Sequence, residues 1–326
     1  MSIFSDRAVL VTGGAGFIGS HLVERFISEG SAVRVIDDFS TGSRDNLAPF
    51  LDRIDLHETS ITDAEACAAA CEGVDYVFHQ AALPSVARSV ADPTATHHVS
   101  ATGTLNMLVA ASDAGVKRLV YAGSSSAYGD TATLPKHEEM PSMPRSPYAV
   151  AKLAGEHYVQ VFPHLFGLET AVLRYFNVFG PRQDPNSVYS AVIPLFINAA
   201  LAGHPPTING DGGQTRDFTY IDNVVSANLL ACMAPADRVS GEVFNVGCGE
   251  RISVTDLWQA IQTALGTELE AKYGPARPGD VRDSLADLTK IADRMGYGVK
   301  VPLQEGIGLT ADWLRSQAQV PAAAGF

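Results

Sequence analysis

Short runs of β-branched and other apolar residues alternate with longer amphipathic stretches through the first half of the chain. The short runs predict strands at Ala8–Thr12, Ala32–Asp37, Ile54–Glu58, Tyr76–His79, Leu119–Ala122, Thr170–Arg174 and Gly241–Gly247. Helical spacing predicts helices at Phe17–Glu29, Asp63–Cys71, Pro93–Ala114 and Pro147–Phe162. Strands that alternate with helices in this way predict an α/β fold, a doubly wound parallel sheet with helices on both faces.

After Asn177 this alternation loosens into longer loops, and only Gly241–Gly247 returns as a strand of the main sheet. We therefore expect a second, smaller domain that is discontinuous in the sequence. The predicted boundaries are 1–176 plus 218–250 for the sheet domain, and 177–217 plus 251–326 for a smaller α/β substrate domain.

Composition narrows the classes of function. The chain has 326 residues, is 46% hydrophobic and 18% charged, and carries a formal net charge of −13, which argues against a nucleic-acid partner. No apolar stretch approaches the roughly 20 residues that span a bilayer, so no membrane partner is expected. The 4 cysteines are too few for a disulfide framework and the N-terminus lacks a signal-peptide layout. We predict a cytoplasmic protein with no metal site.

A glycine-rich loop, Val11 to Gly19, follows the first strand and opens the first helix. Gly13 would allow the tight turn, Gly16 would let the backbone approach a pyrophosphate, and Gly19 would let the helix pack on the sheet. Asp37 ends the second strand, where a carboxylate hydrogen-bonds the adenosine ribose and repels a 2′-phosphate. This context predicts a Rossmann domain that binds NAD in preference to NADP, although Arg44 lies nearby.

Tyr148 and Lys152 lie four residues apart at the start of a predicted helix and therefore share one face. A nearby ammonium and a positive nicotinamide ring would lower the pKa of the phenol, so that Tyr148 could take a proton from a substrate hydroxyl. A Tyr-x-x-x-Lys pair often occurs by chance. Here the strand Leu119–Ala122 also delivers Ser124 to the ligand-binding edge of the sheet, where it could bond both the tyrosine and the reacting oxygen.

The segments that carry these residues resemble the extended short-chain dehydrogenase/reductase family, and within it the UDP-hexose 4-epimerases. They are VTGGAGFIGSHLVE, AGSSSAYGD, SPYAVAKLAGE, LRYFNVFGPRQDPN, TRDFTYIDNV and GEVFNVG. The resemblance implies a UDP-sugar substrate, a nucleotide-sugar domain beside the Rossmann domain, and a homodimer through a four-helix bundle. The helices near Pro93–Ala114 and Pro147–Phe162 would form that bundle.

The resemblance also implies the roles of the reacting residues. Tyr148 is the base, Lys152 holds the nicotinamide ribose and tunes Tyr148, and Ser124 is the catalytic hydroxyl. Hydride passes from the sugar C4 to NAD, the 4-keto sugar rotates, and the hydride returns to its other face. Related 4,6-dehydratases carry an Asp-Glu pair where this chain has Ser125 and Ser126, which argues against dehydration.

The implied cofactor site contains these residues and others from the carboxyl ends of several strands. Its members are Gly13, Gly16, Phe17, Ile18, Gly19, Asp37, Ser60, Ile61, Gln80, Ala81, Ala82, Tyr148, Lys152 and Tyr175. The chain departs from the family at Ser60, where an aspartate commonly contacts adenine, at Ser100, where an asparagine is usual, and at Pro84, where some epimerases have lysine.

The implied substrate site combines a phosphate grip with contacts to uracil, ribose and sugar. Its members are Ser125, Ser126, Asn177, Val192, Thr207, Asn209, Arg216, Arg277, Asp280 and Ser284. The two arginines suit a diphosphate because a guanidinium binds two oxygens at once. Ser284 stands where members restricted to UDP-glucose and UDP-galactose carry tyrosine, so its small side chain favours UDP-GlcNAc and UDP-GalNAc.

Two alternatives remain at this point. A UDP-glucuronate 4-epimerase or decarboxylase would need a basic group at the sugar C6, for which Arg88 is the candidate, but residues 182–186 lack the pattern typical of UDP-glucuronate epimerases. An NAD-sensing regulatory protein on the same fold would usually have lost the tyrosine or the lysine, and this chain keeps both.

Overall fold

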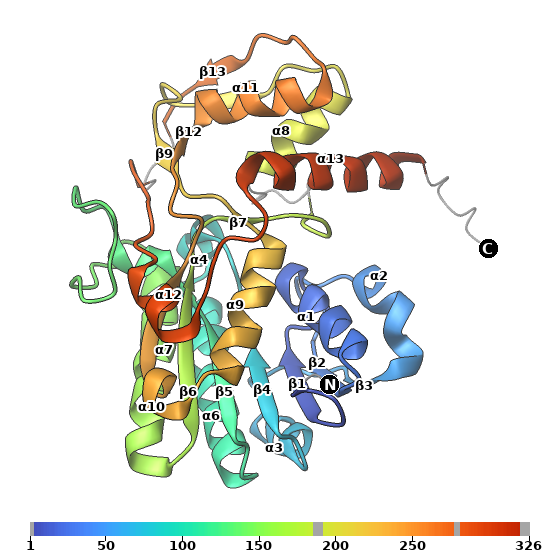
Figure 1. The fold of residues 1–326 in the computed structure, drawn as a ribbon, viewed down its shortest axis with the longest axis vertical. Helices are drawn as coiled ribbons and strands as arrows, with labels where there is room; N and C mark the ends of the chain where they lie inside the picture. Colours follow the sequence, from blue (N-terminus) through green and yellow to red (C-terminus); the bar gives the residue numbers. More distant parts are fainter. Residues whose placement is uncertain (1–2, 185–191, 277–280, 320–326) are drawn as a thin grey trace.

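The computed structural model describes residues 3–184, 192–276 and 281–319. A parallel sheet of 7 strands forms its centre, in the order β11-β6-β5-β4-β1-β2-β3 (Figure 1). The strands are β1 (Ala8–Thr12), β2 (Ala32–Ile36), β3 (Ile54–His57), β4 (Tyr76–His79), β5 (Arg118–Ser124), β6 (Glu169–Tyr175) and β11 (Glu242–Val246). The predicted fold class is confirmed, and β5 extends far enough to include Ser124.

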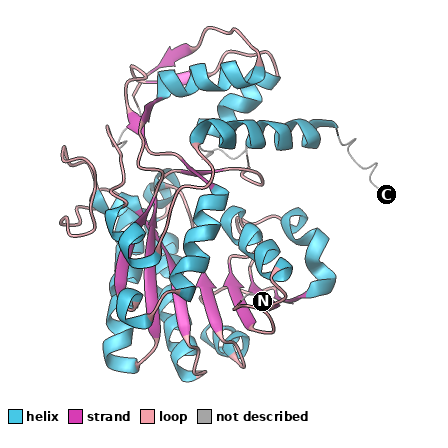
Figure 2. Ribbon diagram, viewed as in Figure 1, coloured by secondary structure: helices cyan, strands magenta, loops and turns pink. Residues whose placement is uncertain are grey.

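Helices cover both faces of the sheet, as the cyan ribbons around the magenta strands show (Figure 2). One face packs against α1 (Phe17–Ser28) and α9 (Ile221–Met233), and the other against α3 (Ala64–Cys71), α6 (Gly103–Asp113) and α7 (Pro147–Phe166). Neighbouring strand residues therefore enter opposite cores: Val120 packs with the first set of helices and Tyr121 with the second. Both cores are apolar, which explains the continuous hydrophobic runs of the parallel strands.

The predicted helix Pro93–Ala114 is interrupted. It consists of α5 (Pro93–His97), a π-helical turn at His98–Thr102, and α6. Asp92 caps α5 through the N–H of Ala95, as the Asp-Pro pair predicts. The apolar pattern does not reveal the wider turn, and π-bulges of this kind are frequent at functional sites.

Helix α7 begins at the predicted Ser146 cap but ends at Phe166 instead of Phe162. Pro163 lies inside it and has no N–H to donate to the carbonyl of Val159. The Thr170 hydroxyl donates to that carbonyl at 2.7 Å instead. A tertiary hydrogen bond thus replaces the missing helical one, and the helix continues for another turn.

Of the segments after Asn177, α8, α11 and α13 lie above the sheet in Figure 1, whereas α9, α10, β11 and α12 lie with the sheet. Three short strand pairs lie outside the central sheet: β7 (Val178–Phe179) with β10 (Thr219–Tyr220), β9 (Thr215–Arg216) with β12 (Ile252–Ser253), and β8 (Thr207–Asn209) with β13 (Lys272–Gly274). The remaining elements are α2 (Arg44–Leu47), η1 (Ala48–Arg53), α4 (Val86–Ala91), η3 (Ser125–Tyr128), α8 (Val192–Leu201), α10 (Ala236–Val239), α11 (Val254–Leu265), α12 (Thr289–Met295) and α13 (Leu303–Gln319).

We propose the predicted boundaries, 1–176 plus 218–250 and 177–217 plus 251–326, as the division into two domains. One helix departs from this division in space, because α12 packs against β11 at the edge of the central sheet. The chain therefore crosses back to the sheet after residue 281 and leaves it again before α13.

Candidate active site

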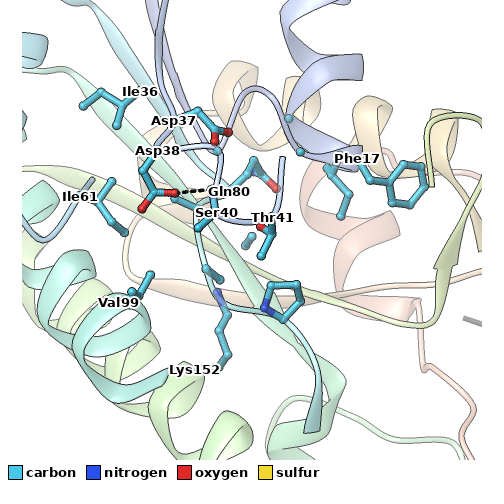
Figure 3. Close-up of a pocket in the computed structure, with 18 of the residues that line it drawn as sticks. Phe17, Ile36, Asp37, Asp38, Ser40, Thr41, Ile61, Gln80, Val99 and Lys152 are labelled. Carbon is cyan, nitrogen blue, oxygen red and sulfur yellow. Dashed lines mark hydrogen bonds between the residues drawn. The ribbon is translucent and has the colours of Figure 1, made fainter. Parts of the chain in front are cut away.

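A pocket opens at the carboxyl ends of the central strands, between the glycine loop and α7 (Figure 3). Of the predicted cofactor residues, every one except Ser60 lines it. Figure 3 shows Asp37 and Asp38 on one side of the pocket and Lys152 reaching into it from α7. The pocket also contains residues that the prediction missed: Ile36, Asp38, Ser40, Thr41, Thr59, Pro84, Val99, Ala122 and Gly123.

The glycine loop is shaped by close approaches of backbone to backbone. Gly13 has φ +67°, and a Cβ there would lie 2.8 Å from the backbone of Ala81. A Cβ at Gly19 would overlap the carbonyl oxygen of Gly13, the residue directly after β1, so the glycine allows the start of α1 to lie against the end of that strand. Helix α1 starts here, after Gly16, so its free N–H groups point into the pocket region where a phosphate would be stabilised.

Asp37 directly follows β2 and is buried against the glycine loop. Its carboxylate accepts hydrogen bonds of 2.8 Å from the N–H groups of Ala15 and Phe39, while burial raises its pKa. Arg44, the residue that could have bound a 2′-phosphate, instead forms a two-pronged ion pair with Glu58 at 2.6 and 2.7 Å. Its guanidinium also lies 4.2 Å from the centre of the Phe39 ring. The charge that faces the ribose end of the pocket is therefore the carboxylate, which fits NAD.

Tyr148 and Lys152 line the same pocket, and Ser124 directly follows the lining residue Gly123. Ser124 ends β5 and hydrogen-bonds the Tyr148 side chain, and its hydroxyl lies 2.8 Å from that of Ser126. Burial raises the pKa of Tyr148 above its ordinary value, and the bond to Ser124 offsets only part of that effect. The protein groups alone therefore do not produce the lowering that the sequence predicts.

The pKa of Lys152 is also changed by burial. This lysine is 4% exposed, and burial lowers its pKa to about 7, with the Glu156 carboxylate acting in the opposite direction. Near neutral pH the lysine is thus only partly charged, and its help to a Tyr148 phenolate is reduced accordingly. A buried amine that titrates near neutrality beside a phenol and a serine is typical of a proton-transfer site.

The residues that depart from the family lie in different settings. The Ser60 hydroxyl accepts hydrogen bonds from the N–H and the hydroxyl of Thr62, while its neighbours Thr59 and Ile61 line the pocket. Pro84 also lines the pocket. Ser100 is buried in the π-helical turn, and its hydroxyl has no hydrogen-bond partner among the residues that the structure describes.

The predicted substrate residues form a second group, and none of them lines the cofactor pocket as described. Ser125 and Ser126 follow Ser124 in η3, Thr207 and Asn209 lie on β8, and Val192 begins α8. Asn177, at φ +22°, accepts the Thr219 N–H through its carbonyl. Arg277 and Asp280 lie outside the described residues.

Arg216 and Ser284 are brought together although they are far apart in the sequence. Arg216 lies next to Thr215 on β9. The N–H of Ser284 donates to the Thr215 carbonyl at 3.1 Å. The Arg216 guanidinium donates to the carbonyls of Thr215 and Arg282. The residue expected to grip phosphate and the residue expected to contact the sugar are therefore held on adjacent backbone segments.

Asp217 is a site residue that the sequence analysis missed. It is fully buried, and its carboxylate accepts the N–H groups of Cys248, Gly249 and Ala286 at 2.8–3.1 Å. Burial raises its pKa to about 6. This side chain ties β9 to the end of β11 and to the segment that carries Ser284. Its position directly after Arg216 in the TRDF segment was the available signal.

Within the described ranges there is no group of three or more His, Cys, Asp or Glu side chains arranged to hold a metal ion. Nor does that part of the chain contain a helix with the length and apolar character needed to cross a membrane.

Comparisons with known proteins agree with this geometry. The model of the NAD dependent epimerase/dehydratase family matches residues 9–247. A UDP-glucose 4-epimerase of Mycolicibacterium smegmatis is 40% identical over 95% of this chain and 99% of its own length. The structure of a Thermotoga maritima UDP-glucose 4-epimerase with UDP-glucose has a TM-score of 0.91 and 39% identity, covering 96% of this chain and 100% of that one. A Methanobrevibacter ruminantium UDP-N-acetylglucosamine 4-epimerase, in complex with UDP-N-acetylmuramic acid, has a TM-score of 0.90 and 38% identity, covering 96% and 99%.

Proposed function

This chain belongs to the NAD-dependent epimerase/dehydratase family, with NAD as its cofactor, and we propose that it is a UDP-sugar 4-epimerase. One observation carries the proposal: Tyr148 and Lys152 line the same pocket as the glycine loop and Asp37, and Ser124 hydrogen-bonds Tyr148. The likeness to 4-epimerases over nearly the whole length of both chains supports the same reaction.

The chain's own groups suit each part of the cofactor. Free N–H groups at the start of α1 would bind the pyrophosphate, and Asp37 would accept the ribose hydroxyls. Bound NAD supplies the chemistry of taking a hydride from the sugar C4 and giving it back to the other face of that carbon. Lys152 would hold the nicotinamide ribose and, when charged, stabilise the Tyr148 phenolate.

Tyr148 would take the proton of the C4 hydroxyl as the sugar is oxidised and return it when the ketone is reduced. Ser124, already hydrogen-bonded to Tyr148, would donate to the same sugar oxygen and keep it in line with the phenol. Ser125 and Ser126 supply hydroxyls where a dehydratase needs an acid and a base to eliminate water. These side chains favour epimerisation over dehydration.

Tyr148→Phe tests the assignment of the base. The variant keeps the ring and its packing but cannot accept the proton, so we expect turnover to fall by at least about 10²-fold, the scale of general acid–base catalysis. NAD binding, measured by calorimetry, should remain close to that of the wild-type protein. Near-normal turnover by Tyr148→Phe would show that another group is the base.

For the sugar, we propose UDP-GlcNAc and UDP-GalNAc, with UDP-glucose and UDP-galactose as further substrates. The proposal depends on the small side chain of Ser284, which is held beside Arg216 through the Thr215 carbonyl. Ser284→Tyr would fill the space for a 2-acetamido group. We expect kcat/KM for UDP-GlcNAc to fall at least about tenfold, with the UDP-glucose value largely kept. Equal losses for both sugars would contradict this role.

A UDP-glucuronate 4-epimerase or decarboxylase is the alternative enzyme. Its cation for the sugar carboxylate would have to be Arg88, on α4, which is not among the residues that line the described cofactor pocket. Release of carbon dioxide from UDP-glucuronate, or its C4 epimerisation in preference to UDP-GlcNAc, would favour this alternative. If the NAD-loaded protein turned over none of these sugars, an NAD-sensing regulatory role would be favoured instead.

We also propose a cytoplasmic homodimer built on a four-helix bundle of α6 and α7. Apolar side chains are exposed along these helices at Val109, Val150, Tyr158, Val161 and Leu165. On α7 they recur at helical spacing and form a stripe that a partner helix would cover. Val161→Glu should convert the dimer to a monomer in light scattering. An unchanged mass would place the interface elsewhere.

A further inference from the structure

Tyr121 contacts Lys152 in two ways. It lies on β5, three residues before Ser124, and is fully buried. The ammonium nitrogen of Lys152 lies 4.2 Å from the centre of its ring, and its hydroxyl donates to the backbone carbonyl of Lys152 at 3.1 Å. One side chain therefore holds both the main chain and the charged end of the same lysine.

The imidazole of His79 also lies near the Tyr121 ring, but it is uncharged. His79, on β4, lies 5.6 Å from the ring of Tyr121, centre to centre. Its two ring nitrogens are occupied by the hydroxyls of Thr12 and Thr104, and burial lowers its pKa to about 3. His79 is therefore neutral at working pH, and Lys152 is the cation that faces Tyr121.

The other charged and titratable groups around Lys152 lie on its own helix and on β6. Tyr148 and Glu156 lie one turn before and one turn after it on α7, and Glu156 is paired at 2.6 Å with Arg174 of β6. The Glu156 charge favours the ammonium form but is shared with that guanidinium. The Tyr121 ring is the remaining protein group in described contact with the ammonium.

Gly155 makes the contact sterically feasible. A Cβ at this position would lie 2.6 Å from the Tyr121 hydroxyl oxygen and 3.1 Å from the ring carbon that bears it. Any larger residue would push the ring and the helix apart. The glycine thus allows β5 and α7 to approach closely enough for the ring to reach Lys152.

We propose that Tyr121 is a positioning residue for Lys152: its ring stabilises the ammonium beside Tyr148, and its hydroxyl fixes the turn of α7 from which the lysine projects into the cofactor pocket. The inference rests on the proposed function and deepens it, since it assigns a group that increases the share of Lys152 in the ammonium form. An aromatic face stabilises a cation, and the size of this stabilisation corresponds to a rise in the pKa of the cation by about 0.4–1.5 pH units. The hydrogen bond from the Tyr121 hydroxyl to the Lys152 carbonyl fixes the backbone from which the lysine side chain extends. It therefore also fixes where the ammonium group lies in the pocket.

The test measures the titration of Lys152 directly in the holoprotein. The rate at which Lys152 is acetylated by a small reagent would be followed against pH by mass spectrometry of its peptide. In Tyr121→Leu the ring is lost, and the midpoint should fall by about 0.4–1.5 pH units because the ammonium loses its stabilising contact. Tyr121→Phe keeps the ring and should keep the midpoint. Phe162→Leu removes a buried aromatic ring from the same core and should leave it unchanged.

A second pair of variants covers the case in which Tyr121→Leu does not fold. Gly155→Ala should lower the midpoint, since its methyl group displaces the Tyr121 ring, and adding Tyr121→Phe should restore part of the shift by removing the hydroxyl that clashes. A midpoint that stays at the wild-type value in both Tyr121→Leu and Gly155→Ala would overturn the inference, as would an equal shift in Phe162→Leu. The readout needs no sugar, so a protein that shows the shift but epimerises no UDP-sugar would contradict the proposed function alone.

Discussion

Replacing Glu156 by glutamine would leave the Arg174 guanidinium buried without its carboxylate. The two side chains are 2% and 4% exposed and form paired bonds of 2.6 and 3.0 Å. Little else is available to compensate the charge: the Arg174 guanidinium lies over the Tyr128 ring at 4.6 Å, and one of its terminal nitrogens already lacks a partner among the described residues. Breaking a buried pair of this kind costs about 3–5 kcal/mol in the free energy of unfolding.

Urea unfolding at equilibrium, followed by tryptophan fluorescence, would measure this cost through the shift in midpoint at constant slope. The chain offers a matched control in Glu58→Gln. Glu58 binds Arg44 with bonds of 2.6 and 2.7 Å, but these side chains are 50% and 64% exposed. Water can solvate the arginine after this substitution, so the midpoint should hardly move.

Burial, and not bond length, is the quantity under test. A loss of less than about 1 kcal/mol in Glu156→Gln would refute the reasoning, because an uncompensated buried guanidinium cannot be so well tolerated. Equal shifts in the two variants would refute it as well. Glu156→Gln should also lower the pH midpoint of the Lys152 titration below that of the wild-type protein, since the carboxylate charge that favours the ammonium is removed.

Three further substitutions test the cofactor loop and the substrate segments. Asp37→Asn turns an amide N–H₂ group toward a backbone donor and removes the charge, so calorimetry should show NAD binding weakened by about tenfold or more. Gly19→Ala should abolish NAD binding because its methyl group overlaps the carbonyl of Gly13, whereas Gly308→Ala, where a Cβ meets open space, should not. The pKa of Asp217, raised from 3.8 to about 6, predicts that its contribution to stability is present below pH 4 and lost as the pH rises through 6, by about 3 kcal/mol. Asp217→Asn should flatten the dependence of unfolding free energy on pH in that window.

The sheet and most of the cofactor pocket were predictable because local patterns determine them. A parallel strand buried on both faces appears as a continuous apolar run, and the glycine loop must follow the first strand of such a sheet. Tyr148 and Lys152 share a helix face by spacing alone, and the Ser146-Pro147 cap starts that helix where predicted. These features depend on neighbours a few residues away.

What the sequence analysis missed depends on contacts between distant segments. The bond from Thr170 to the Val159 carbonyl, which carries α7 past Pro163, joins a strand to a helix and leaves no periodic trace. The role of Asp217 likewise depends on N–H groups that lie 31, 32 and 69 residues away. The raised pKa of Tyr148 follows from burial, which the Tyr-x-x-x-Lys spacing does not report.

Epimerisation of UDP-GlcNAc that carries deuterium at C4 would show whether the hydride removed from C4 returns to the same carbon. The NAD-loaded protein would be incubated with this sugar in ordinary water, without added oxidant or reductant, and the products resolved by proton NMR. We expect UDP-GalNAc that keeps its C4 deuterium, because the hydride removed from that carbon returns to it. Loss of the deuterium to solvent, or no C4 epimer from either UDP-GlcNAc or UDP-glucose, would contradict the proposed mechanism.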